Sequence, residues 1–148
     1  MRFSIKTNVQ QSYKQVFHGF DESLFLALAP PFPKVKLLRF DGCKKGDEVH
    51  LELNLIFFKQ RWDAEIIENG ELENELYFID KGAQLPFFLK KWKHHHRIIG
   101  HENGTSDIVD AIEYTTPFFL FDYLMFPVLY LQFAVRKPIY KRIFNGGI

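Results

Sequence analysis

Apolar residues recur at nearly every second position from residue 34 to residue 115, and beyond residue 118 their spacing becomes helical. In the clearest period-two segment the apolar members are Val49, Leu51, Leu53, Leu55 and Phe57. The residues between them are polar, which predicts a strand with one wet face and one buried face. The apolar face of such a sheet must be covered, and the helical stretch at the C-terminus is the only long apolar element that can cover it.

Seven strands and two short helices are predicted before that final helix. The other period-two segments are 3–9, 35–40, 62–66, 72–78, 92–97 and 108–114. Asn69-Gly70 is a favoured hairpin pair and predicts the turn between segments 62–66 and 72–78. Ser12 and Asp21 are suited to cap two short helices that follow the first strand. This order predicts an α+β fold in a single domain over residues 1–148, with a seven-stranded curved antiparallel sheet wrapped around a long C-terminal helix.

The C-terminal segment is expected to be a buried helix and not a membrane span. Residues 118–135 form an apolar run at the lower limit of spanning length, but Asp122 and Gln132 interrupt it. Pro127 fits the first turn of a helix, whereas Pro138 should kink or cut it. Gly146-Gly147 is expected to end the helix. The sequence therefore predicts no integral membrane segment.

A hairpin rich in histidine links the last two strands. Its turn is Glu102-Asn103-Gly104, a three-residue loop with glycine at the position that requires positive φ. In this register Trp92 faces Tyr114, His94 faces Ile112 and His96 faces Asp110, all on the apolar face. Lys93 faces Glu113 on the other side. An apolar face that carries imidazoles and a carboxylate is typical of a ligand cavity.

Charge and cysteine content limit the partners and the cellular compartment that the sequence predicts. Nineteen basic residues nearly balance eighteen acidic ones, so no strong field favours nucleic acid as a partner. Cys43 is the only cysteine, and no leader-like segment follows Met1, which predicts a reduced, cytoplasmic protein. The 17 phenylalanines fit either a filled core or the stiff wall of a cavity.

The chain resembles the START/Bet v 1-like superfamily of helix-grip proteins (SRPBCC), which includes polyketide cyclase-like members. The resemblance covers nearly the whole chain in element order and is sharpest over residues 78–136. The motifs that carry it are Phe78-Ile79-Asp80, Pro86-Phe87, residues 92–96, Gly104-Thr105, residues 110–114, Pro117, Phe133 and Arg136. It implies a ligand cavity between sheet and helix, and it brings no catalytic residue set and no cofactor.

We therefore expect binding of a small, largely apolar molecule, such as a lipid, polyketide or isoprenoid-like compound. The expected contact residues are Leu53, Leu55, Trp62, Phe78, Trp92, His94, His96, Asp110, Ile112, Tyr114, Met125 and Leu129. Asp110 is expected to accept a hydrogen bond from His96 and to fix its tautomer. Asp80 is expected to end a strand.

Two alternatives remain open at this point. One is a cyclase- or hydrolase-type enzyme in which His96 and Asp110 form a general base inside apolar walls. The other is a metal site made of His94, His96 and Asp110. Arg39 and Arg61 are long enough to reach a ligand carboxylate, but charges at strand edges are usually solvated. The number of subunits is not predicted.

Overall fold

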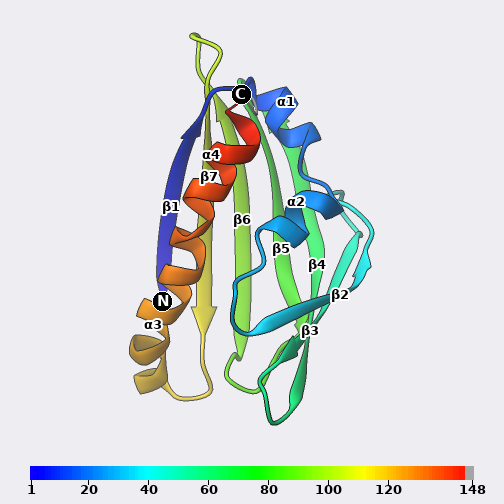
Figure 1. The fold of residues 1–148 in the computed structure, drawn as a ribbon, viewed down its shortest axis with the longest axis vertical. Helices are drawn as coiled ribbons and strands as arrows, with labels where there is room; N and C mark the ends of the chain where they lie inside the picture. The colour runs from blue at the N-terminus through cyan, green and yellow to red at the C-terminus, as the bar shows by residue number, and fades with distance from the viewer. Residues whose placement is uncertain (146–148) are drawn as a thin grey trace.

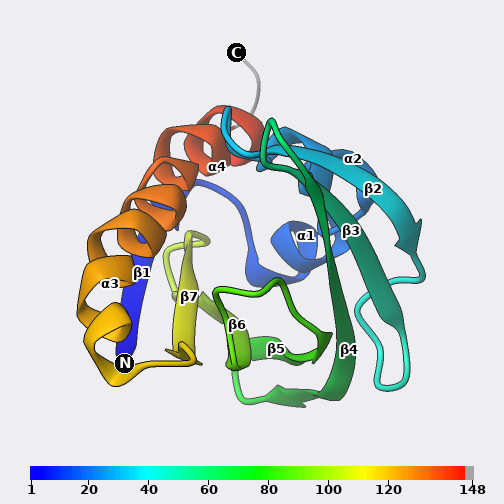
Figure 2. The same cartoon turned by 90° about the horizontal axis from the view of Figure 1, so that it is seen from below.

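Seven antiparallel strands form one curved sheet, and two consecutive helices lie across its concave side (Figure 1, Figure 2). The computed structural model describes residues 1–145. The strands are β1 (Arg2–Val9), β2 (Lys34–Phe40), β3 (Glu48–Asn54), β4 (Lys59–Leu72), β5 (Glu75–Gln84), β6 (Lys91–Gly100) and β7 (Ser106–Thr115). Their order across the sheet is β1-β7-β6-β5-β4-β3-β2. The predicted fold class is confirmed.

Two short helices follow β1, as the capping residues predicted. They are α1 (Tyr13–His18) and α2 (Glu22–Ala27). Ser12 Oγ accepts a hydrogen bond from the Gln15 amide at 3.3 Å, and Asp21 Oδ1 accepts one from the Leu24 amide at 2.9 Å. Each side chain satisfies an amide that the first turn of a helix leaves free.

The C-terminal segment is divided into α3 (Phe119–Ala134) and α4 (Arg136–Phe144), which meet at Val135. Pro138 lies in the first turn of α4, and it has no amide to donate to the carbonyl of Ala134, so the predicted cut is confirmed. Pro127 is inside α3 and not in its first turn, which corrects that prediction. The predicted stop at Gly146-Gly147 lies outside the described residues.

Strand β3 is shorter than the sequence predicted. The strand expected to reach Phe57 ends at Asn54, because the chain turns there with Ile56 at φ 76°. Asn54 Oδ1 accepts a hydrogen bond from the Ile56 amide at 3.0 Å, which stabilises this turn. Phe57 is consequently 92% exposed and is not part of the apolar face.

The Asn69-Gly70 turn was a wrong prediction. Both residues lie within β4, where Gly70 pairs with Tyr77 of β5. A Cβ at Gly70 would lie 2.8 Å from Tyr77 Oη, so the ring of Tyr77 covers the glycine and occupies the space of a side chain. The chain turns instead just before β5, where Asn74 adopts φ 59°, a conformation that asparagine tolerates.

Four polar side chains on the concave face, Asp80, His94, His96 and Asp110, form a layer that divides the buried interior into two apolar clusters. One cluster lies around α1 and α4 and contains Val9, Val16, Leu24, Leu28, Ile98, Ile108, Tyr140 and Phe144. The other lies around the inner side of α3 and contains Ile5, Leu89, Trp92, Ile112, Tyr114, Leu129 and Phe133. Along β7, Asp110 separates Ile108 of the first cluster from Ile112 of the second, so the polar layer crosses the middle of the concave face.

The continuous segment Phe119–Phe144 is long and apolar enough to cross a membrane by length and composition. In this fold its inner side packs against the sheet through Leu129, Phe133, Tyr140 and Phe144, all of which are buried. It therefore serves as the covering helix of a helix-grip domain. Much of its outer side remains exposed and apolar.

Candidate functional site

A cavity of about 540 Å³ lies between the sheet and the C-terminal helices. The helices α3 and α4 contact the sheet mainly at β1 and β7. The curved far side, formed by β2, β3 and β4, therefore stays clear of them (Figure 2). Apolar side chains from those strands, including Val49, Leu51 and Ile66, form one wall of the space that remains. Helix α2 and α3 contribute further walls.

The β6–β7 hairpin has the register that its turn residues predicted. Trp92 pairs with Tyr114, His94 with Ile112 and His96 with Asp110. The amide of His101 donates to the carbonyl of Thr105, and Gly104 between them has φ 84°. This is the three-residue loop with a G1 bulge, and it places the histidines on the concave face.

The predicted bond between His96 and Asp110 is not formed, and each histidine bonds a different carboxylate. His94 Nε2 lies 2.8 Å from Asp110 Oδ1, and His96 Nε2 lies 2.8 Å from Asp80 Oδ2. His96 Nδ1 is 3.8 Å from Asp110 Oδ1, beyond hydrogen-bond distance. Both bonded pairs are diagonal neighbours, because His96 faces Asp110 and His94 faces Asp80 across the ladders. A diagonal partner, about 7–8 Å away along the sheet, is still within reach of an aromatic side chain such as an imidazole.

The two imidazoles stack on each other within this arrangement. Their ring centroids are 3.4 Å apart, and the outer face of His96 stacks on Phe78 at 4.1 Å. Trp92 Nε1 also donates to Asp80 at 3.2 Å, and the Tyr140 hydroxyl donates to Asp110 at 3.3 Å. Both buried carboxylates are thus bonded by two donors, and the rings have little freedom to rotate.

Burial and hydrogen bonding fix the charge states of this layer. Burial lowers the pKa of His94 to about 4, although its bond to Asp110 opposes the shift. Burial, the largest single influence, would raise the pKa of Asp110, but the hydrogen bond from His94 and the charges of His94, Arg136 and His96 together lower that pKa to about 2. The pKa of Asp80 is also lowered, since the hydrogen bonds from His96 and Trp92 and the charges of the two imidazoles together overcome burial, the largest single influence. At neutral pH, His94 is therefore neutral and both carboxylates are ionised.

These charge states determine the tautomers. An ionised carboxylate only accepts, so His94 and His96 must carry their protons on Nε2. The Nδ1 atom of the neutral His94 is then left as a lone pair. Within residues 1–145, His96 Nδ1 is buried without a hydrogen-bond partner. His94 Nδ1 lies 3.7 Å from Asp80 Oδ2, so two acceptors face each other there. The layer is rich in acceptors and poor in donors.

Most of the predicted contact residues line the cavity. Those that do are Leu53, Leu55, Trp62, Phe78, Trp92, His94, His96, Met125 and Leu129. Asp110, Ile112 and Tyr114 do not, which corrects their assignment as contact residues. They lie on the concave face but are covered by the C-terminal helices, and each is at most 2% exposed. Asp110 affects the cavity only indirectly, because it bonds His94, which lines the cavity.

Sequence reasoning missed Asp80 because it placed the end of the strand there. Strand β5 continues to Gln84, and Asp80 lies in its middle, on the same face as Phe78. The period-two spacing of Leu76, Phe78 and Asp80 was the signal that could have placed it on the concave face. The wrong turn at Asn69-Gly70 obscured this register.

Among the described residues, Asp80, His94 and His96 form the group that most resembles a metal site. Each offers one ligand atom, and these atoms lie within 4.8 Å of one another. The carboxylate in this group is Asp80, whereas the sequence had suggested Asp110. Two imidazoles and a carboxylate form a donor set that suits a divalent transition metal.

Cys43 also lines the cavity. Burial raises the pKa of its thiol to about 12, with smaller contributions from nearby carboxylates. A thiol with such a pKa stays protonated at neutral pH and is a poor nucleophile. Cys43 therefore contributes to the wall and not to thiolate chemistry.

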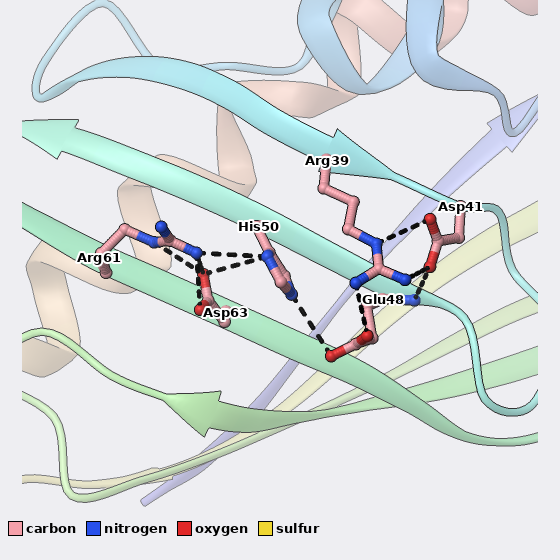
Figure 3. Close-up of polar contacts among 6 residues, drawn as sticks. All are labelled: Arg39, Asp41, Glu48, His50, Arg61 and Asp63. Atoms are coloured by element: carbon pink, nitrogen blue, oxygen red, sulfur yellow. Dashed lines mark hydrogen bonds and ion pairs between the residues drawn. The ribbon is translucent and has the colours of Figure 1, made fainter.

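A second group of charged residues lies on the outer face of β2, β3 and β4, away from the cavity (Figure 3). Arg39 pairs with Asp41 and Glu48 at 2.8 Å each. Arg61 bonds Asp63 through both of its carboxylate oxygens, and it donates to the Nδ1 of His50, which also contacts Glu48. Neither arginine lines the cavity, and both are partly exposed, in agreement with the expectation that charges at strand edges are solvated. These contacts link β2 to β3 and β3 to β4, the strands whose inner face forms one wall of the cavity.

The geometry defines a helix-grip protein with an internal cavity, and solved structures have the same architecture. An uncharacterised protein from Bacillus thuringiensis superposes with a TM-score of 0.68 and 16% identity, over 97% of this chain and 98% of that one. Norcoclaurine synthase from Thalictrum flavum gives a TM-score of 0.65 at 11% identity, over 95% and 93%. The Zhui aromatase/cyclase from Streptomyces sp. R1128 gives 0.56 at 15% identity, over 80% and 69%.

The chain thus has the helix-grip fold that its sequence resemblance to START/Bet v 1-like proteins implied. No protein-family model and no curated protein matches the sequence. At 11–16% identity the likeness to these structures concerns the fold and not the reaction or ligand.

Proposed function

We propose that the protein binds a small, largely apolar molecule in the cavity between the sheet and the C-terminal helices. The observation that carries this proposal is the cavity of about 540 Å³. Pockets for small ligands typically measure about 300–1,000 Å³ and combine apolar walls with a few fixed polar groups. Here the walls are aliphatic and aromatic, and the polar groups are concentrated at Asp80, His94 and His96.

The polar layer suggests how the ligand is oriented. His94 lines the cavity, and its neutral imidazole keeps an acceptor lone pair at Nδ1, while the Nε2 donors of His94 and His96 are already bonded to Asp110 and Asp80. A ligand hydroxyl would satisfy an acceptor that otherwise remains unpaired, which favours its placement at this layer. The rest of the molecule would lie against Leu53, Trp62 and the other apolar walls. A lipid, polyketide or isoprenoid-like compound with one hydroxyl group has this character.

The two tryptophans make binding measurable without a label. Trp62 and Trp92 are the only tryptophans in the chain, and both line the cavity in edge-to-face contact at 4.7 Å. An apolar fluorescent probe that enters the cavity should accept energy from them or quench them. We expect saturable titration with one site per chain.

Filling the cavity should abolish this binding. Ala64 is buried and lines the cavity, so Ala64→Phe places a ring in the empty space. We expect about a tenfold or greater loss of probe affinity, because the ring and the probe compete for the same volume. The matched control is Ala111→Phe on the outer side of β7, which should leave affinity unchanged. Equal affinity in wild type and Ala64→Phe would refute binding in this cavity.

Acid–base catalysis is the second candidate function, because two histidine–carboxylate pairs border an apolar cavity. The pair suited to this role is His96 with Asp80 and not His96 with Asp110. A carboxylate that holds an imidazole in one tautomer makes the free nitrogen a potential base. A cyclase- or hydrolase-type enzyme would lose turnover in His96→Ala while retaining its thermal unfolding transition. Unchanged turnover in that variant would exclude the role.

A metal ion at Asp80, His94 and His96 is the third candidate. It requires His96 to move its proton from Nε2 to Nδ1, which would then point toward Asp110. Metal analysis of the purified protein before and after chelation tests this candidate, since a built site should hold about one ion per chain.

The proposal of ligand binding also includes a cytoplasmic location, which the single cysteine suggests, and no nucleic acid among the partners.

A further inference from the structure

We propose that one end of the molecule docks on an anionic lipid bilayer. This apolar end consists of Ile56, Phe57 and Phe58 in the turn between β3 and β4, Phe87 between β5 and β6, and residues 118–120 at the start of α3. All of these side chains are exposed, and Phe57 and Phe119 are 92% and 72% exposed. Contiguous exposed apolar surface on a folded protein marks a site of protein or membrane contact.

Three separate turns come together to form this end. The rings of Phe58 and Phe87 lie 5.7 Å apart, which joins the first two turns. The amide of Lys90 donates to the carbonyl of Thr115 at 2.8 Å, which joins the second turn to the segment that leads into α3. All three turns lie at the lower end of Figure 1 and face the viewer in Figure 2. Their apolar side chains are exposed, which suits insertion into a fluid surface.

The outer side of α3 extends this surface. Leu120, Leu124, Val128 and Leu131 recur at helical spacing, and all four are exposed. An exposed apolar stripe on a helix of a folded domain is characteristic of helices that lie in the membrane interface. Tyr123, exposed on the same helix, is a side chain favoured at the boundary between lipid tails and headgroups.

The charges around the apolar end favour anionic lipid over a second copy of this chain. Segments 55–58, 85–89 and 115–121 contain no aspartate or glutamate. Lys90 and Lys91 are exposed beside them and form no ion pair with any residue in the described range 1–145. One acidic residue, Asp122, follows the last of these segments and stays ionised, because the hydrogen bond from the Thr116 amide at 2.6 Å lowers its pKa, so the two lysines outnumber it. A symmetric dimer through this end would bring lysines against lysines, whereas anionic headgroups attract them.

The apolar end also adjoins the cavity. Leu55, Phe87 and Met125 line the cavity and lie on the β3–β4 turn, the β5–β6 turn and α3. A ligand could thus pass between the bilayer and the cavity without crossing open water. Docking itself needs no cavity ligand, so it can be tested even if the proposed binding function is wrong.

The test is sedimentation with vesicles of two compositions, phosphatidylcholine alone and phosphatidylcholine with about 30% phosphatidylglycerol. The second composition supplies the anionic headgroups that attract basic surfaces. We expect the wild-type protein to sediment with the mixed vesicles and to bind the neutral ones more weakly. The double variant Phe57→Ser, Phe119→Ser should bind the mixed vesicles at least about tenfold more weakly, because two exposed rings are lost. Neither ring lines the cavity, so probe binding there should be unaffected.

Two further variants complete the design. Leu72→Ser removes an exposed apolar side chain at the opposite end of β4 and should leave vesicle binding unchanged. Lys90→Glu with Lys91→Glu should abolish the preference for the anionic vesicles. Wild-type protein that stays in the supernatant with both vesicle types would overturn the proposal. So would a wild-type dimer that becomes monomeric in Phe57→Ser, Phe119→Ser, since that result would identify the apolar end as a subunit interface.

Discussion

Replacing Asp110 with alanine is expected to lower the free energy of unfolding by about 3 kcal/mol. Asp110 is 1% exposed and accepts hydrogen bonds from His94 and Tyr140. The substitution removes an ionised acceptor and leaves two buried donors without partners, in a position that water does not reach. Chemical denaturation at neutral pH, with the transition followed by circular dichroism, measures the change.

Glu113→Ala on the same strand is the matched control for this prediction. Its carboxylate is about half exposed on the outer face and pairs with Arg2, which is 80% exposed. Exposed ion pairs contribute little, so we expect a change below about 1 kcal/mol. If Asp110→Ala were no more destabilising than Glu113→Ala, the hydrogen-bonded layer would not be the structural centre of the concave face.

The stability of the protein is expected to fall as the pH is lowered from about 6.5 to about 4. The ordinary pKa of histidine is 6.5, and burial lowers the pKa of His94 to about 4 in the folded state. Between these values the unfolded chain binds a proton at His94 that the folded chain does not. The stabilisation is therefore fully present above pH 6.5 and is lost as the pH falls, by about 3 kcal/mol in total.

Denaturation curves at several pH values, for wild type and His94→Gln, test this dependence. Glutamine does not titrate, and its amide can still donate to Asp110, so the difference between the two proteins isolates the contribution of His94. We expect the wild type to lose stability more steeply than the variant across this window. Parallel curves for the two proteins would contradict the buried, neutral state of His94.

The sequence contained enough information for the fold and for the register of the last hairpin. Alternation depends only on which face is buried, and Glu102-Asn103-Gly104 admits one register because Gly104 must adopt positive φ. Local rules failed where a distant ring changed the outcome. Gly70 could remain in β4 because Tyr77, seven residues along the chain, covers it.

The composition of the polar layer was harder to predict than its location. Histidines 94 and 96 were placed on the concave face correctly, but their partners were not. The bond from His96 to Asp80 joins a third strand, β5, whose register the hairpin sequence does not determine. The choice of a diagonal partner over the facing Asp110 depends on side-chain length and on the stacking of the two rings. The volume of the cavity was beyond sequence reasoning, because 17 phenylalanines fit a filled interior equally well.

Native mass spectrometry of protein purified without detergent tests the central proposal most directly. The chain has a mass of 17.6 kDa. Binding in the cavity predicts a second species that carries one small molecule, which organic solvent extracts and which Ala64→Phe fails to retain. A spectrum that shows only the bare chain, together with no saturable uptake of any small apolar compound offered to it, would contradict the proposal.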